Sequence, residues 1–159
     1  SRRRHTRSSN VTGVQTCAFR SYVKPLLAAL KATGGGGQGG AIKALSHITG
    51  GGLSENLPRV LPGNVAARID LSGWRAPGVF GWLAEVGGLD DDEMLRTFNC
   101  GIGMVVVAEK ARANAVMASL KEAGEAPAVI GEVIPPTGGK SEAKGKGEAW
   151  AVKYVGRLG

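Results

Sequence analysis

The sequence predicts an α/β fold of the α+β kind, a single mixed sheet with helices packed on it. Runs rich in β-branched residues, such as 102–107 and 128–134, have the composition of buried strands. Between such runs, apolar residues recur at intervals of three and four, which is the spacing of amphipathic helices. Glycine or proline ends most of these stretches. Strands that alternate with helices in this way indicate helices layered on a sheet.

Each element has its own local pattern. The residues expected to form strands are 42–48, 65–71, a stretch within 97–107, 128–134 and, as an edge strand, 150–155. The residues expected to form helices are 22–33, a short segment behind Gly52 that stops at Pro62, 79–86, a segment opening at 89–94, and 111–123. Two polar or glycine-rich stretches, 34–40 and 137–147, are expected to be a flexible connector and a loop.

The first 21 residues differ in composition from the rest. They are rich in Arg, Ser and Thr and lack apolar periodicity, so a disordered tail is predicted over 1–21 and one domain over 22–159. The tail resembles translated library-adapter sequence rather than native protein. A natural disordered arm and a nucleic-acid-binding tail are the alternatives.

The positive charge is concentrated in this tail. Five arginines within 1–20 account for +5 of the formal charge of +7, which leaves +2 for the remainder. A near-neutral domain argues against a nucleic-acid partner, and the later cluster Lys140, Lys144 and Lys146 lies in the predicted loop. Two cysteines make no disulfide framework, and no apolar run has the length of a membrane span. A cytoplasmic location without a membrane partner is therefore expected.

A triple glycine, Gly50, Gly51 and Gly52, follows the apolar run that ends at Ile48. Consecutive glycines let backbone amides converge on a ligand, and a helix start behind them adds positive potential. This arrangement predicts an anion site, with phosphate as the natural ligand. A tight turn without a ligand is the alternative.

Five polar side chains are candidates for contact with a ligand or for catalysis: four lie close to these glycines in the sequence, and Asn99 lies farther along the chain. Thr49 offers a hydroxyl, Asn56 and Arg59 extend from the following helix, and Arg59 has the fork that phosphate prefers. His47 is a tentative catalytic residue for proton transfer, with a buried structural histidine as its alternative. Asn99 precedes a Gly-Ile-Gly turn and either presents its amide to a ligand or caps that turn.

Two further groups are interpreted as structural. Cys100 is expected to be a small core residue with an unreactive thiol. The acids Asp90 to Asp92 open a helix, where its dipole favours them, so no metal site is predicted. No catalytic triad, Walker lysine motif or dinucleotide fingerprint occurs in the sequence.

Several ordered motifs resemble the C-terminal domain of the phosphoribosylformylglycinamidine cyclo-ligases, also called aminoimidazole ribonucleotide synthetases. The resemblance runs from about Tyr22 to about Tyr154. The motifs are Tyr22-Val-Lys-Pro-Leu-Leu27, Ser46-His-Ile-Thr-Gly-Gly-Gly-Leu53, Glu55-Asn-Leu-Pro-Arg-Val-Leu-Pro62, Arg96-Thr-Phe-Asn-Cys-Gly-Ile-Gly-Met104 and Ile130-Gly-Glu-Val133.

The resemblance implies a function in de novo purine biosynthesis. Enzymes of that family use ATP and Mg²⁺ to close formylglycinamidine ribonucleotide to aminoimidazole ribonucleotide, and a homodimer is expected for the full-length enzyme. The turn from His47 to Gly52, with Asn56 and Arg59, would help to hold the substrate ribonucleotide. The family's N-terminal domain supplies most ATP and Mg²⁺ contacts and does not precede Tyr22 here. This chain is therefore expected to be inactive alone and to bind neither cofactor by itself.

Two rival interpretations stay open. Formylglycinamidine synthetase and selenophosphate synthetase belong to the same superfamily, and their C-terminal halves share the fold. The amino-acid sequences of segments 47–52 and 99–104 favour the cyclo-ligase. A non-catalytic nucleic-acid-binding module is the rival from another class, suggested by the pI of 9.8.

Overall fold

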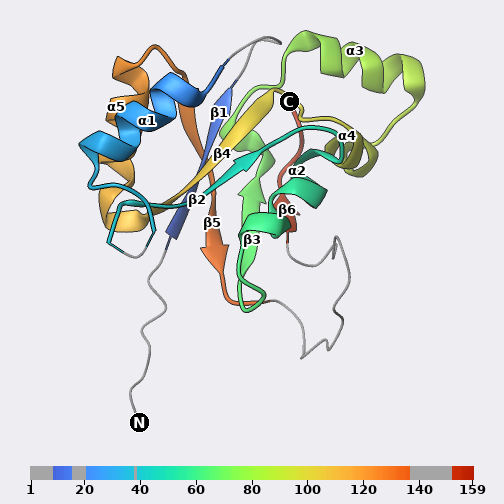
Figure 1. Ribbon diagram of the computed structural model, residues 1–159. Helices are drawn as coiled ribbons and strands as arrows, with labels where there is room; N and C mark the ends of the chain where they lie inside the picture. The colour runs from blue at the N-terminus through green and yellow to red at the C-terminus, as the bar shows by residue number, and fades with distance from the viewer. Residues whose placement is uncertain (1–8, 16–20, 38, 137–151) are drawn as a thin grey trace.

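The fold is a six-stranded mixed sheet with helices on both faces (Figure 1). A computed structural model describes residues 9–15, 21–37, 39–136 and 152–159. The strand order is β2-β4-β1-β5-β3-β6, and every neighbouring pair is antiparallel except β3 and β6, which run parallel. The strands are β1 (Ser9–Gln15), β2 (Ile42–His47), β3 (Ala66–Asp70), β4 (Ile102–Glu109), β5 (Pro127–Ile134) and β6 (Val152–Val155). This architecture confirms the predicted fold class.

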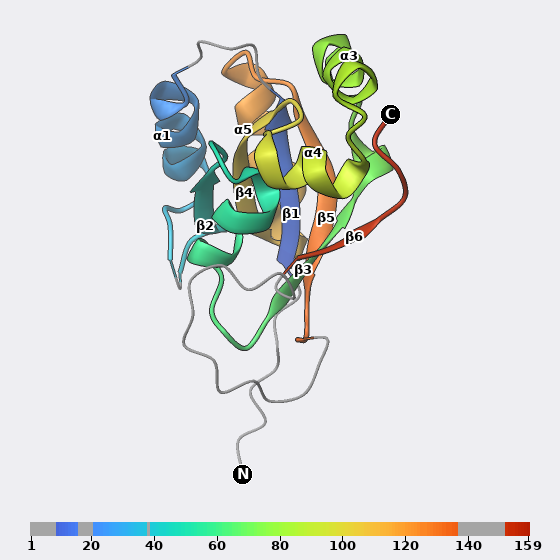
Figure 2. The ribbon, with the colours of Figure 1, turned by 90° about the vertical axis from the view of Figure 1, so that its right-hand side faces the viewer.

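The helices divide between the two faces of the sheet. The α-helices are α1 (Val23–Ala32), α2 (Gly52–Asn56), α3 (Gly78–Gly87), α4 (Asp91–Thr97) and α5 (Ala113–Glu122). Three short 3₁₀ helices are η1 (Pro58–Val60), η2 (Leu71–Gly73) and η3 (Lys110–Arg112). Figure 2 shows α1 and α5 on one side of the sheet and α2 and α4 on the other. No helix in the described part of the chain is long and apolar enough to cross a membrane.

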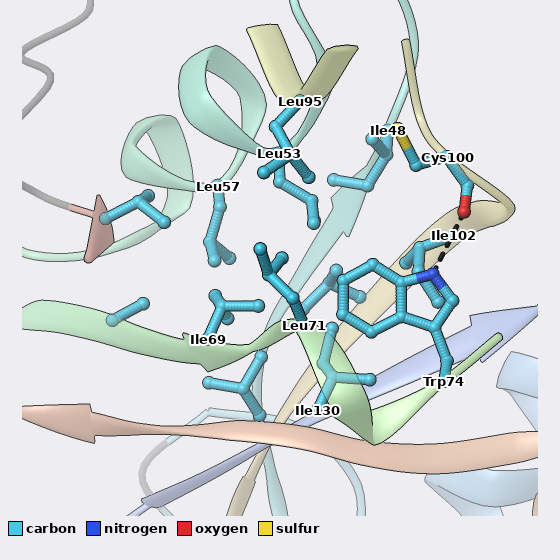
Figure 3. Packing of buried hydrophobic residues seen from close by; sticks show 14 of the residues in the cluster. Ile48, Leu53, Leu57, Ile69, Leu71, Trp74, Leu95, Cys100, Ile102 and Ile130 are labelled. Atoms are coloured by element: carbon cyan, nitrogen blue, oxygen red, sulfur yellow. Dashed lines mark hydrogen bonds between the residues drawn. The ribbon is translucent and has the colours of Figure 1, made fainter. Parts of the chain in front are cut away.

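The main core lies between the sheet and the α2/α4 side (Figure 3). Buried side chains of α2, α4 and the strands meet there, together with the ring of Trp74. Ten of these residues are Ile48, Leu53, Leu57, Ile69, Leu71, Trp74, Leu95, Cys100, Ile102 and Ile130. A smaller cluster on the other face joins α1 and α5 to β2 and β4. Both faces of β4 are covered, so its residues from Ile102 to Ala108 are all buried. This explains why the strand reads as a continuous apolar run.

The N-terminal segment is the main correction to the sequence-based predictions. Residues 1–21 were expected to form a disordered tail, but Ser9–Gln15 is a strand between β4 and β5, and Val11 is fully buried. Two neighbouring strands supply all the backbone partners that this polar segment needs. The expectation of a tail is therefore wrong for residues 9–15.

Helix α1 forms where predicted, but only part of its predicted face is buried. The spacing of Val23, Leu26, Leu27 and Leu30 predicts one apolar face, yet Val23 and Leu27 are 61% and 50% exposed. Leu26 is buried as expected, together with Pro25 and Ala29, and Leu30 packs against the smaller cluster. The 3.6-residue period fixes the helix but not its rotation about its own axis.

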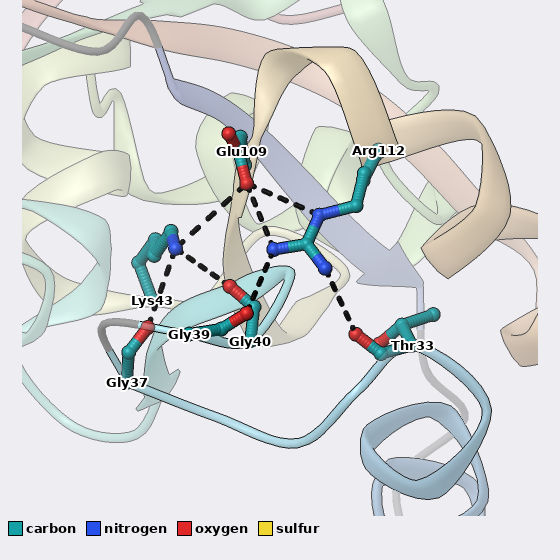
Figure 4. Close-up of polar contacts among 7 residues, drawn as sticks. All are labelled: Thr33, Gly37, Gly39, Gly40, Lys43, Glu109 and Arg112. Carbon is teal, nitrogen blue, oxygen red and sulfur yellow. Dashed lines mark hydrogen bonds and ion pairs between the residues drawn. The ribbon is translucent and has the colours of Figure 1, made fainter.

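The glycine-rich segment 34–40, predicted to be a flexible connector, is tied to the sheet through its carbonyl oxygens (Figure 4). Lys43 Nζ donates to Gly40 O at 2.6 Å, and Arg112 Nη2 donates to Gly39 O at 3.1 Å. Glu109 accepts from Arg112 at 2.9 Å and pairs with Lys43 at 3.9 Å. Since carbonyls point at these cations, this segment is not arranged like a phosphate-binding loop, which presents amides.

Some sequence-based predictions concern residues outside the described part of the chain. These are the loop over 137–147 and the basic cluster Lys140, Lys144 and Lys146. The predicted edge strand over 150–155 is confirmed for Val152–Val155, which among the described strands pairs only with β3.

Candidate functional site

The triple glycine forms a sharp turn between β2 and α2. Strand β2 ends at His47, and the amide of Ile48 donates to Gly103 O at 2.9 Å. Gly51 and Gly52 then take φ values of 91° and 56°, the left-handed region that glycine adopts without a steric cost. The predicted strand-glycine-helix arrangement is therefore present. Pro58 begins η1 rather than the helix directly behind the glycines.

Gly52 is pressed against the end of α4. A Cβ atom at this position would overlap the carbonyl oxygen of Leu95 and lie 2.6 Å from that of Phe98. Gly52 itself is buried. Its role is thus close packing of the turn on α4, and only the two preceding glycines reach the surface.

Asn56 holds the turn from inside. Its side chain is 6% exposed, and its Nδ2 donates to Gly52 O at 2.8 Å and to Gly50 O at 3.1 Å. Its backbone oxygen accepts from Ser46 Oγ at 3.0 Å. The side-chain amide of Asn56, which the sequence offered to a ligand, thus donates to carbonyl oxygens of the turn itself.

The surface of the turn carries the remaining candidates. Thr49 and Gly50 are exposed, and Gly51 is partly exposed. Among the described residues, the amides of Gly50 and Gly51 donate to no backbone carbonyl, so both remain available to an acceptor. His47 is exposed and lies edge-on to Tyr22 with ring centroids 6.1 Å apart. Its alternative as a buried structural histidine is therefore wrong.

Arg59 lies on the same side as the turn. Its Nη1 donates to Asn56 Oδ1 at 3.3 Å, and its Nη2 lies 3.6 Å from Glu55 Oε2. Both members of the ion pair are at least half exposed, so the pair itself contributes little stability. The guanidinium is accessible to a second anion, which would share it with Glu55.

Asn99 caps the second turn of the site. Its Oδ1 accepts from the amide of Gly101 at 3.0 Å, which is the capping alternative that the sequence left open. Cys100 follows with a φ of 46°, unusual for a residue that is not glycine. Trp74 Nε1 donates to Cys100 O at 2.9 Å and helps to fix this backbone (Figure 3).

The structure brings these two turns together. The Ile48–Gly103 hydrogen bond and the Gly52–Phe98 contact place the glycine turn beside the turn at 99–101. A hollow of about 390 Å³ lies elsewhere, between β2, η1 and the end of β5, and a shallow cleft of about 530 Å³ crosses β5 and β3. Neither is lined by any of the predicted site residues.

The sequence analysis missed a hydrogen bond that ties α2 to strand β6. Tyr154 of β6 shares a hydrogen bond of 2.8 Å with Ser54 of α2, 100 positions earlier in the chain. Burial raises the pKa of Tyr154 to about 12. No local pattern links these residues, because their contact exists only once β6 has joined the sheet.

The acids of α4 have structural partners. Asp90 Oδ1 caps the helix by accepting from the amide of Glu93 at 2.9 Å, and Asp91 Oδ2 accepts from the amide of Leu158 at 3.2 Å. Within the described residues, no three His, Cys, Asp or Glu side chains are grouped as metal ligands.

Cys100 makes stability depend on pH. Burial, with a smaller contribution from the Asp91 charge, raises the pKa of the thiol from 9.0 to about 11. The folded state therefore keeps a proton that the unfolded state releases, so this stabilisation is complete below pH 9 and is lost as the pH rises to about 11.

We expect the urea midpoint to fall between pH 9 and pH 10, an interval in which the thiol contributes more than Tyr154, whose ordinary pKa of 10.0 lies at its upper end. Cys100→Ala removes the thiol and should give a flatter profile over that interval, even though it lowers stability at pH 7. Equal slopes for the two proteins would contradict a buried, protonated thiol.

Comparison with known proteins places this fold in a family. A sequence model of the family described as AIR synthase related protein, C-terminal domain, matches residues 5–144. E. coli HypE, a hydrogenase maturation protein, is 21% identical with a TM-score of 0.60, over 93% of this chain and 46% of that one. The crystal structure of a HypE–HypF complex gives 19% identity and a TM-score of 0.59, over 80% and 47%.

A third solved structure has the same architecture. Thiamine-monophosphate kinase from Stenotrophomonas maltophilia K279a is 14% identical with a TM-score of 0.51, over 95% of this chain and 51% of that one. The chain thus spans about half the length of these solved chains. At such identities the likeness establishes the fold.

Proposed function

The chain belongs to the AIR synthase related family, as its C-terminal domain, and from this premise we propose that it is the substrate-binding half of a phosphoribosylformylglycinamidine cyclo-ligase. The full enzyme would close formylglycinamidine ribonucleotide to aminoimidazole ribonucleotide at the expense of ATP, in the cytoplasm. The observation that carries the proposal is the exposed glycine turn, with two unengaged amides beside an arginine.

The turn suits the phosphate of a ribonucleotide. Backbone amides supply directional donors, and Arg59 supplies a full positive charge with a forked geometry. Asn56 would act indirectly: its hydrogen bond to Gly50 O holds that carbonyl inward, and the amide of Gly51, which belongs to the same trans peptide group, therefore points outward. Gly52 would likewise serve by packing rather than by contact.

His47 and Thr49 are proposed to lie along the ribose and the reacting groups. Both are exposed next to the turn, at the end of β2. His47 carries an imidazole, the side chain that most often serves as a general acid or base, so it is the candidate for proton transfer at the amidine or the formyl oxygen. Asn99 would position the neighbouring turn through its bond to Gly101.

ATP and Mg²⁺ are proposed to be bound mainly by an N-terminal half of the full enzyme. Glu55, the carboxylate nearest the turn, is paired with Arg59, and the described residues offer no grouped metal ligands. The part proposed for these residues is to bind and orient the ribonucleotide. Pairing with an N-terminal half, within a homodimer, would then complete the catalytic site.

Removing the arginine tests the proposal. Arg59→Ala in the full chain should weaken binding of aminoimidazole ribonucleotide about tenfold, because a charge-assisted hydrogen bond is lost. Isothermal titration calorimetry measures the dissociation constant, and circular dichroism checks that the fold is retained.

Arg68→Ala is the matched control. Arg68 is also an exposed arginine paired with a glutamate, Glu132, but it lies on β3 away from the turn. The Arg68→Ala variant should leave the affinity for aminoimidazole ribonucleotide unchanged. Equal losses for both variants would mean that net charge rather than the turn binds the ligand.

A second candidate is another ATP-using enzyme of the same superfamily, such as formylglycinamidine synthetase or selenophosphate synthetase. The fold shared with E. coli HypE and with thiamine-monophosphate kinase motivates it. Titration with formylglycinamide ribonucleotide, the synthetase substrate, separates the readings. Tighter binding of this ligand than of aminoimidazole ribonucleotide would favour the synthetase.

A further inference from the structure

Strand β6 contacts the helix that follows the glycine turn. Tyr154 lies opposite Ile69 of β3, and its hydroxyl shares a hydrogen bond of 2.8 Å with Ser54 Oγ. Ser54 is the third residue of α2, two positions after Gly52. The ring of Tyr154 packs against the main core. The contact therefore joins the core to the backbone directly behind the turn.

The hydrogen of each hydroxyl in this contact follows from the second partner of Ser54. Ser54 Oγ also donates to Leu95 O over 3.4 Å, and a serine hydroxyl has a single hydrogen. In the arrangement that satisfies both contacts, Tyr154 is therefore the donor to Ser54, which in turn donates to Leu95. The three groups form a directed chain of hydrogen bonds, in which each bond polarises the next.

This chain of hydrogen bonds ends on the atom against which the turn is packed. Leu95 O is the oxygen that a Cβ atom at Gly52 would overlap, so the position of this carbonyl sets how closely the turn approaches α4. Because the contact joins two backbone segments at close packing, a displacement of Leu95 O moves the turn with it.

The turn is also joined to α2 through its own backbone. The amide of Gly52 donates to Thr49 O at 3.1 Å. The amide of Glu55 donates to Gly51 O, also at 3.1 Å, and Glu55 directly follows the serine that Tyr154 contacts. A shift of α2 therefore changes the conformation of the turn and the direction of its exposed amides.

We propose that Tyr154 is a positioning residue for the phosphate site. Through Ser54 it holds α2 and Leu95 O in the places that keep the amides of Gly50 and Gly51 turned toward the ligand. Tyr154 does not contact the ribonucleotide itself, and its role rests on the function proposed for the turn. The geometry of the anion site is thus complete only once β6 has joined the sheet.

Tyr154→Phe tests this role, because it removes the hydroxyl and keeps the ring. In the full chain, aminoimidazole ribonucleotide should bind to the variant about fivefold more weakly, since one hydrogen bond that fixes the turn is lost. The affinity for the matching nucleoside, which lacks the phosphate, should not change. Isothermal titration calorimetry well below the melting transition of both proteins measures the dissociation constants. An unchanged affinity for the ribonucleotide would overturn the proposal.

Thr33→Val is the matched control. Thr33 is buried, and its hydroxyl donates to Ala29 O at 2.7 Å, at the end of α1. The control removes one hydroxyl that is bonded to the protein, so it should lower the melting temperature and leave the affinity for the ribonucleotide unchanged. If Thr33→Val weakened binding as much as Tyr154→Phe, lower stability alone would explain both losses and the proposal would fail.

A double-mutant cycle tests whether Tyr154 acts through Ser54. Ser54→Ala removes the hydroxyl that relays the contact, so adding Tyr154→Phe to it should cause no further loss of affinity for the ribonucleotide. Losses that multiply in the double variant would mean that the two residues act independently, which contradicts the proposed relay.

The ¹⁵N spectrum of the ligand-free chain separates positioning from ligand binding. Tyr154→Phe should shift the amide resonances of Gly50 and Gly51, and Thr33→Val should leave them in place. Unmoved resonances in Tyr154→Phe would overturn the positioning role even if the turn binds phosphate. Shifted resonances in a chain that does not bind the ribonucleotide would support the positioning of the turn and refute its phosphate function.

Discussion

Gly52→Ala is expected to lower the free energy of unfolding by about 3 kcal/mol or more. A methyl group at this position adds the cost of a left-handed backbone, since φ is 56°, to an overlap with the carbonyl oxygen of Leu95. Because both obstacles are backbone features, no side-chain rotation relieves them. Urea unfolding followed by Trp fluorescence measures the change, and ligand affinity should fall with it as the turn moves away from α4.

Gly50→Ala is the control for this prediction. Gly50 is exposed, and no atom lies within 4 Å of where its Cβ would be. Its stability should change by no more than about 1 kcal/mol. If the two alanine variants proved equally stable, Gly52 would not be packed against α4 as described.

Val11→Asp should be at least as damaging, with a loss of about 3–5 kcal/mol. The side chain of Val11 is fully buried in the main core, so the change places an unpaired carboxylate among apolar groups. The predicted result is an unfolded or aggregating chain at neutral pH. Circular dichroism and analytical ultracentrifugation measure it directly.

Val129→Asp makes the same chemical change on the neighbouring strand. Val129 is 43% exposed and borders the shallow cleft on β5, so a carboxylate there stays hydrated. Its effect should be about 1 kcal/mol or less. A Val11→Asp chain as stable as the Val129→Asp chain would mean that residues 9–15 are the disordered tail that their composition suggested.

The strands that sequence predicted are those with apolar residues on the faces that become buried. β4 and β5 carry runs of valine and isoleucine, and β3 alternates Ile69 with the exposed Arg68 and Asp70. β1 has no such run, because Asn10 and Thr12 interrupt it. Its position is set by two partner strands that lie far along the chain, beginning at Ile102 and Pro127, and strand formation depends strongly on that context.

The sequence predicted where the candidate site lies, but not which of its residues face a ligand and which hold the turn in place. Three consecutive glycines mark the turn in the sequence, and the exposure of Thr49 and Gly50 agrees with it. That Gly52 serves packing depends on α4, whose Leu95 lies far along the chain. Asn56 looked like a ligand contact, but its amide is engaged by the carbonyls of the turn, a geometry that spacing alone does not reveal.

The glycine-rich segment gives the same lesson for flexibility. Its composition is typical of a mobile linker. Arg112 reaches Gly39 O from 73 positions away and fixes a segment whose sequence is glycine at six of its seven positions. Long-range contacts of this kind are invisible to any window of local sequence.

The most direct test of the phosphate site is the amide spectrum of the glycine turn. Titration of the ¹⁵N-labelled chain with aminoimidazole ribonucleotide should shift the Gly50 and Gly51 amide resonances in a saturable manner. The matching nucleoside, which lacks the phosphate, should leave them in place. Shifts confined to other residues, or equal shifts with the nucleoside, would show that the turn does not bind the phosphate.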